Sequence, residues 1–297
     1  MPEIDDDQLT FVIAPPRSGS TLLARMLGSH PVIHAPPEPQ LVPALFQLGY
    51  YGHVKDSGLR DGAMAYHPGV VARSAETLVR GLPRGEADYI DALKLFLTTL
   101  YGRLLAKSGK RMLVDKSPRN SLYVDFIVRL FPKTRFVILT RDPLAVAWSI
   151  RHQLGHVDEQ LVVEMAAFTR AVGTCIRERP VECCHVRYER LVANAEQEMA
   201  RVCDFLKVPY DAKMLDYGAN SEAWEGVGDT IVVNKHSRPT DEHVDKWARD
   251  VMADPAKGTA LAKALRACRE EDIASWGYSF AELEAKLERA VREGRQT

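Results

Sequence analysis

The feature of this sequence that most limits its fold is a repeated order of short apolar segment, polar loop and helix. Residues 10–14 (TFVIA) form the first apolar segment. A loop containing Pro15 and Gly19 follows, and residues 20–28 then place four large apolar side chains on one helical face. Apolar runs without alternation are typical of strands buried on both faces of a parallel sheet. We therefore predict an α/β fold.

The same order recurs along the rest of the chain. We expect further strands at residues 111–115, 135–140 and 184–187, and helices at residues 121–131, 145–150, 158–177 and 194–206. Ser279 and Glu282 have the spacing of a capping box for the last helix. We predict one domain over residues 1–297, with an N-terminal tail (1–9), a loop or lid (47–70) and C-terminal helices (256–297).

Composition excludes several classes of protein. The 297 residues carry a formal net charge of −1, so no global charge indicates a nucleic acid partner. No apolar run approaches the roughly 18 residues of a membrane span, and residues 1–7 lack the basic and apolar parts of a signal peptide. The five cysteines are odd in number and form no C-x-x-C, which predicts reduced thiols. We expect a cytoplasmic protein.

The first loop has the residues of an anion site. Backbone N–H groups at a helix N-terminus have no partner within the helix and favour an anion. Gly19 allows close approach of the backbone, Ser18, Ser20 and Thr21 offer hydroxyl groups, and Arg17 adds a guanidinium suited to phosphate or sulfate oxygens. The alternative is an ordinary turn with a helix cap. The position of the loop directly after the first strand favours a phosphate-type site.

This loop is not a Walker A motif, because no lysine follows Gly19. A kinase also needs ligands for Mg²⁺ beside its nucleotide, and the strand-end Asp115 is followed by Lys116. A P-loop small-molecule kinase is therefore the weaker interpretation. A protein that binds an adenine nucleotide without catalysis is a further alternative.

A second anion site is predicted where Arg141 ends a strand and Ser149 follows in the next helix. Both side chains reach one phosphate if that helix packs back over the end of the sheet. In the alternative interpretation, Arg141 pairs with Asp142 or a neighbouring carboxylate and Ser149 is solvated. The residues alone leave these two interpretations open.

With these two motifs in this order, the sequence resembles the sulfotransferases that use 3′-phosphoadenosine 5′-phosphosulfate (PAPS). Residues 16–21 are similar to the family's 5′-phosphosulfate loop, and residues 141–149 to its 3′-phosphate motif. Tyr188 lies in a third similar segment, which the family places near the adenine. The resemblance runs from about residue 10 to 250. It implies a P-loop-like three-layer fold, with a central parallel sheet flanked by helices.

Within that family, Arg17 replaces a usual lysine. This departure is similar to the tyrosylprotein sulfotransferases and to the bacterial sulfotransferases of polyketide assembly lines. The resemblance implies Glu38 as general base and Lys116 as a supporting cation. His236 is the second choice of base, because imidazole titrates near neutrality. Ser237 is expected to bind the phosphosulfate, and no metal is expected.

The implied reaction uses PAPS as sulfuryl donor and releases adenosine 3′,5′-bisphosphate. Arg17 and Lys116 supply positive charge at the transferred group. The acceptor is a hydroxyl of a small natural product, of a carrier-tethered β-hydroxyacyl chain or of a tyrosine peptide. We expect residues 40–110 and 215–245 to shape its pocket.

Overall fold

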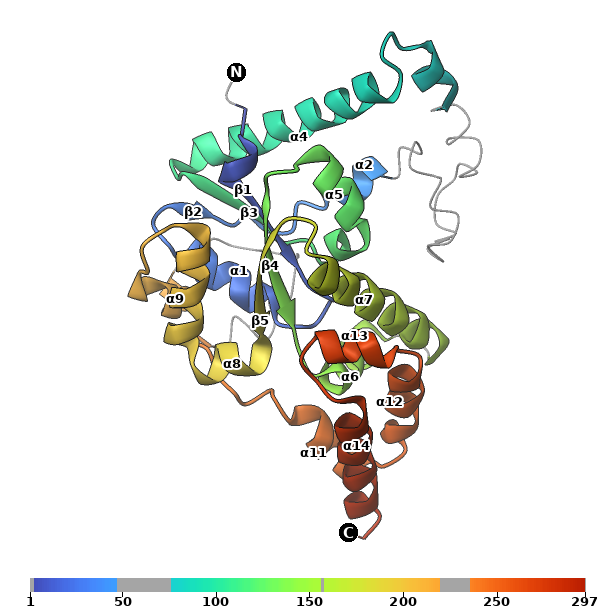
Figure 1. Ribbon diagram of the computed structural model, residues 1–297. Coiled ribbons are helices and arrows are strands. Elements are labelled where there is room, and N and C mark those ends of the chain that lie inside the picture. Colours follow the sequence, from blue (N-terminus) through green and yellow to red (C-terminus); the bar gives the residue numbers. More distant parts are fainter. Residues whose placement is uncertain (1–2, 47–75, 156–157, 220–235, 297) are drawn as a thin grey trace.

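The computed structural model describes residues 3–46, 76–155, 158–219 and 236–296 (Figure 1). The loop or lid predicted at residues 47–70 lies outside these ranges. A five-stranded parallel sheet forms the centre, in the order β2-β3-β1-β4-β5. The strands are β1 (Leu9–Ile13), β2 (Ile33–His34), β3 (Met112–Asp115), β4 (Arg135–Thr140) and β5 (Glu182–Arg187). The predicted α/β fold is therefore confirmed.

Helices cover both faces of the sheet (Figure 1). One face packs against α1 (Ser20–Gly28), α8 (Tyr188–Ala193), α9 (Ala195–Leu206) and the 3-10 turns η3 (Ala212–Leu215) and η4 (Tyr217–Ala219). The other packs against α2 (Leu41–Phe46), α4 (Glu86–Ser108), η2 (Pro118–Tyr123) and α5 (Val124–Leu130). A third group adjoins one end of the sheet: α6 (Pro143–Leu154), α7 (Asp158–Glu178), α11 (Lys246–Ala253), α12 (Lys257–Arg266), α13 (Glu270–Ser275) and α14 (Phe280–Gly294).

The first strand explains why both faces are buried. Successive side chains of a strand point to opposite faces. Val12 accordingly joins the core beside α1, while Phe11 and Ile13 join the core beside α4 and α5. Phe11 pairs in register with Phe136 of β4, and their rings meet edge to face at 6.3 Å. An apolar run in the sequence thus becomes a two-sided core.

Element boundaries differ from the predictions in a few places. The helix expected at residues 121–131 is divided into η2 and α5, because buried polar contacts of Asn120 and Ser121 occupy its first turn. The short β2 and α8 were not predicted, nor were the helices α2 and α4. Within the expected N-terminal tail, Ile4 is buried, η1 (Asp6–Gln8) forms a turn and Leu9 begins β1.

The C-terminal helices build a third core, in which Trp247 is fully buried and Trp148 nearly so.

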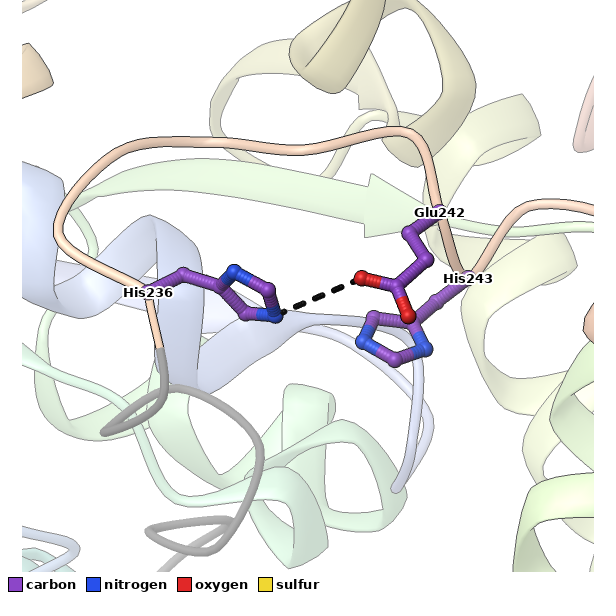
Figure 2. Close-up of side chains that lie close together, drawn as sticks. All are labelled: His236, Glu242 and His243. Carbon is purple, nitrogen blue, oxygen red and sulfur yellow. Dashed lines mark ion pairs between the residues drawn. The ribbon is translucent and has the colours of Figure 1, made fainter.

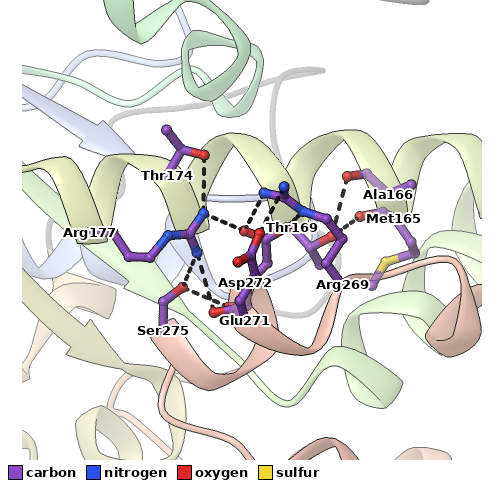
Figure 3. Close-up of polar contacts among 9 residues, drawn as sticks. All are labelled: Met165, Ala166, Thr169, Thr174, Arg177, Arg269, Glu271, Asp272 and Ser275. Carbon is purple, nitrogen blue, oxygen red and sulfur yellow. Dashed lines mark hydrogen bonds and ion pairs between the residues drawn. The ribbon is translucent and has the colours of Figure 1, made fainter.

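One polar cluster joins α13 to α7 (Figure 3). Asp272 lies between two arginines, with Arg269 Nε at 2.7 Å and Arg177 Nη2 at 2.8 Å from its carboxylate oxygens. Within the described ranges, no helix has the length and apolar character needed to cross a membrane.

Candidate active site

The predicted functional residues follow the carboxyl ends of four strands. Parallel strands end at one edge of a sheet, and α/β proteins bind ligands there. The anion loop follows β1, Lys116 follows β3, Arg141 follows β4 and Tyr188 follows β5. The sheet order therefore gathers residues that lie far apart in the sequence.

The loop between β1 and α1 is held in a specific backbone conformation. Gly19 has a φ of +92° and caps α1, and Arg17 has a φ of +64°. A Cβ added at Gly19 meets the Tyr188 ring at 2.5 Å, so only glycine fits there without movement. Ser121 binds both backbone groups of Ala14, accepting from its N–H at 2.8 Å and donating to its carbonyl at 2.9 Å.

The hydroxyl residues of this loop are buried at the start of α1. Ser18 donates to the Pro15 carbonyl at 2.8 Å, which tightens the turn. Ser20 and Thr21 begin the helix and are buried. The first helical N–H groups have no acceptor in a preceding turn, so they point toward the loop. The arrangement is that of an anion-binding helix N-terminus.

Arg141 joins this loop to the second predicted motif. Its guanidinium donates to the carbonyl oxygens of Arg17 (3.1 Å) and His243 (2.6 Å), and it lies 4.3 Å above the Tyr188 ring. Arg17 Nε in turn donates to Ser149 Oγ at 3.2 Å. Ser149 is buried, as expected if α6 packs back over the sheet end. Among the described residues, the Nε of Arg141 is buried without a hydrogen-bond partner.

The alternative in which Arg141 pairs with Asp142 does not match this geometry. Asp142 instead caps α6, accepting from the backbone N–H of Leu144 at 2.8 Å. Burial raises the pKa of this carboxyl, and the charge of Lys286, 3.5 Å away, opposes the shift.

Lys116 and Glu38 form an ion pair beside the anion loop. The Lys116 side chain is fully buried and that of Glu38 is 14% exposed. Lys116 Nζ also donates to Thr21 Oγ1 at 3.3 Å, so it lies between the loop and the carboxylate. Gln40 holds the second Glu38 oxygen at 3.1 Å. This places a cation and a carboxylate next to the same helix N-terminus.

Asp115 organises the strand end that carries Lys116, a role that the sequence analysis did not predict. Its carboxylate accepts from Tyr101 (2.5 Å), Ser117 (2.9 Å) and Asn120 (3.1 Å). Burial raises its pKa, and these hydrogen bonds oppose the shift. The carboxylate therefore faces protein donors rather than the anion loop. The polar residues after Asp115 were the only sequence signal for this network.

His236 and Ser237 lie on a separate segment before α11. His236 Nε2 is 3.7 Å from a Glu242 oxygen, and its ring meets that of His243 at 5.9 Å between centroids (Figure 2). Ser237 is exposed, and its carbonyl accepts from the Gly218 N–H at 3.1 Å. These two residues thus contact a different set of neighbours from Glu38 and Lys116.

A surface cavity of about 480 Å³ lies elsewhere, between α12 and α14. Leu265 and Leu287 line it together with Arg266 and Arg292. None of the residues predicted for the site belongs to its lining.

Comparisons with known proteins agree with the motifs. The model of the Sulfotransferase family matches residues 10–212. Nodulation protein NoeE of Sinorhizobium fredii is 32% identical over 217 residues, covering 65% of this chain but only 48% of that protein, so the match spans about half of NoeE. Protein-tyrosine sulfotransferase 1 of Danio rerio is 23% identical over 276 residues, covering 86% of this chain and 70% of that protein.

Among solved structures, the sulfotransferase domain of the Synechococcus PCC 7002 olefin synthase aligns with a TM-score of 0.56 and 27% identity. The alignment covers 80% of this chain and 86% of that domain. The residues matched by the family model include the anion loop, Glu38, Lys116, Arg141 and Tyr188, whereas the segment around His236 lies beyond them.

Proposed function

Because the chain belongs to the sulfotransferase family, we propose that it transfers a sulfuryl group from PAPS to a hydroxyl of an organic acceptor. The observation that carries this proposal is the junction of the two anion motifs. Arg141 donates to the backbone of Arg17, and Arg17 donates to Ser149. Two phosphate-binding motifs joined in this way suit a donor with phosphate at both the 3′ and the 5′ position.

The proposed donor fits the residues present. The 5′-phosphosulfate occupies the start of α1, near Arg17 and the residues 18–21. The 3′-phosphate binds to Arg141 and Ser149. The buried Nε of Arg141, which has no hydrogen-bond partner among the described residues, can donate to a phosphate oxygen. Tyr188 offers a ring face to the adenine side, and Ser237 is proposed as an additional phosphosulfate ligand.

Glu38 is the proposed general base. It takes the proton of the acceptor hydroxyl as that oxygen bonds to sulfur. The bond from sulfur to the bridging oxygen breaks, and adenosine 3′,5′-bisphosphate leaves. Lys116 and Arg17 stabilise the negative charge that develops on the sulfuryl and bridging oxygens. His236 is the alternative base, since a neutral imidazole can accept the same proton.

For the acceptor, we propose a small natural-product alcohol or a carrier-tethered hydroxyacyl chain. The support is the similarity to a sulfotransferase domain of an olefin synthase. We also propose a cytoplasmic reaction, because the five cysteines are free thiols, as is typical of reducing compartments.

Calorimetric titration with adenosine 3′,5′-bisphosphate, beside ATP with Mg²⁺, tests the proposal. We expect tight binding of the bisphosphate, and we expect Arg141→Ala to weaken it by at least tenfold, because hydrogen bonds from charged groups contribute about 1.5–3 kcal/mol. Binding of ATP with Mg²⁺ and indifference to the 3′-phosphate support the kinase alternative instead. Bisphosphate binding without transfer to any acceptor hydroxyl supports a non-catalytic nucleotide-binding protein.

A further inference from the structure

Three side chains with metal-binding atoms meet on the segment before α11. His236, Glu242 and His243 each offer one ligand atom, and these atoms lie within 4.8 Å of one another. Figure 2 shows the two imidazoles and the carboxylate turned toward a common point. We propose that these residues form a binding site for a divalent transition-metal ion of the Zn²⁺ class.

The donor set decides the class of ion. Two imidazole nitrogens and one carboxylate oxygen suit Zn²⁺, whereas Mg²⁺ and Ca²⁺ prefer oxygen ligands. Around a tetrahedral Zn²⁺ with bonds of about 2.0–2.1 Å, neighbouring ligand atoms are about 3.3 Å apart. The three ligand atoms, which lie within 4.8 Å of one another, must therefore approach by at most about 1.5 Å. Glu242, whose side chain is 62% exposed, has room to make that movement.

The backbone that carries these ligands is already held by hydrogen bonds. The carbonyl of His243 accepts from Arg141 at 2.6 Å, and the carbonyl of Glu242 accepts from Arg249 at 2.7 Å. Next to His236, the carbonyl of Ser237 accepts from Gly218 at 3.1 Å. An ion binding here mainly orders side chains, so the entropic cost of forming the site is small.

His243 provides a second, independent observation. Its Nε2 is buried and has no hydrogen-bond partner among the described residues. A buried polar atom without a partner is unfavourable, and a bound ion removes that penalty.

A metal ion bound here also affects the proposed reaction. This effect on turnover rests on the proposed function, whereas the metal site itself does not. A metal ion on His236 removes the imidazole that we consider as the alternative base. If His236 takes the acceptor proton, Zn²⁺ inhibits turnover; if Glu38 does, it leaves turnover largely intact. Metal binding itself is measurable without any turnover.

The test uses full-length protein, freed of its affinity tag and stripped with EDTA. It is titrated with Zn²⁺ by calorimetry and with Co²⁺ by visible absorption, which reports nitrogen-containing tetrahedral coordination. We expect one saturable site. His236→Ala and His243→Ala should each weaken it by at least tenfold, and Glu242→Gln by less. Mg²⁺ should not compete.

The matched control is His152→Ala, which removes an exposed histidine of α6 outside the cluster and should leave Zn²⁺ binding unchanged. Thermal unfolding in EDTA checks that each variant folds. If His243→Ala fails to fold, the partly exposed His236 decides the question. Absence of saturable Zn²⁺ binding in the parent protein, or binding that survives both histidine substitutions, overturns the proposal.

Discussion

The edge of the sheet and the contact between α7 and α13 both hold charged side chains, but the partners of these side chains differ. Asp272 is fully buried and closed by two arginines, so both carboxylate oxygens have charged partners. At the sheet edge, beside the ion pair of Lys116 with Glu38, Arg141 donates to two backbone carbonyls, which are neutral acceptors. A ligand anion can improve on neutral acceptors but not on a closed ion pair. The difference separates a site for binding from a contact for stability.

If the sheet edge serves the reaction, the largest effect on turnover is expected from Glu38→Gln. Gln retains an oxygen that can accept from the fully buried Lys116, but it no longer accepts a proton. We expect kcat to fall about a thousandfold, since a general base contributes about 10²–10⁴. Steady-state kinetics with PAPS and a hydroxyl acceptor measure this change.

His236→Gln is the matched variant, because it removes the alternative base. A large loss of kcat in His236→Gln with a small loss in Glu38→Gln means that His236, and not Glu38, is the general base. If neither substitution lowers kcat, the proposed proton transfer is wrong. Unchanged binding of adenosine 3′,5′-bisphosphate in both variants shows that folding is not the cause.

Asp272→Ala should reduce stability and leave catalysis intact. The substitution leaves Arg177 and Arg269 without the buried carboxylate between them (Figure 3). Because the side chains of Arg177 and Arg269 are 35% and 43% exposed and stay hydrated, the loss should be smaller than for a fully buried pair, about 2 kcal/mol. Denaturant unfolding should show this loss of free energy, while bisphosphate binding stays the same.

Asp91→Asn is its control, because the pair of Asp91 with Arg84 is exposed on both sides. An exposed pair contributes about 0–1 kcal/mol. Equal destabilisation by the two substitutions means that burial does not distinguish these contacts, and the comparison between closed and open charges fails.

The sequence was sufficient to predict β1, β3, β4 and β5 and the place of the anion loop between β1 and α1, for a physical reason. Buried parallel strands need apolar runs, and the loop after β1 needs glycine and hydroxyl residues, so both leave local patterns. The network around Asp115 depends on Tyr101 of α4, 14 residues earlier, and such a contact has no local pattern. The same holds for the convergence of His236 with His243, which a turn of the backbone creates.

A third substitution tests how closely the anion loop depends on its neighbour. Gly19→Ala places a Cβ 2.5 Å from the Tyr188 ring at a φ of +92°. Overpacking and backbone strain together should cost about 2 kcal/mol, and bisphosphate affinity should fall about tenfold as the loop shifts. Calorimetry and denaturant unfolding measure the two effects.

Gly109→Ala separates strain from contact. Gly109 has a φ of +66°, and nothing lies within 4 Å of an added Cβ. We expect it to lose about 1 kcal/mol of stability and no bisphosphate affinity. If both glycine variants bind equally well, close packing of Tyr188 is not what shapes the loop.

The smallest effect concerns His185, where the sheet meets the C-terminal helices. Its Nε2 lies 2.8 Å from Thr140 Oγ1, and Thr140 donates to the Trp276 carbonyl at 3.3 Å. Burial lowers the pKa of His185 from 6.5 to about 4, and the charges of Arg187 and Arg201 add to the shift. Below about pH 6.5 the unfolded chain therefore binds a proton that the folded chain does not. The free energy of unfolding decreases as the pH is lowered from about 6.5 to about 4.

At about pH 5.5 this loss should be about 1 kcal/mol, and His185→Gln should abolish it. Unfolding free energies of parent and variant, measured between about pH 7 and pH 5, should converge as the pH falls, because the variant lacks the proton uptake. His152→Gln, an exposed histidine, should keep the slope of the parent protein. An unchanged slope in His185→Gln means that this junction does not titrate.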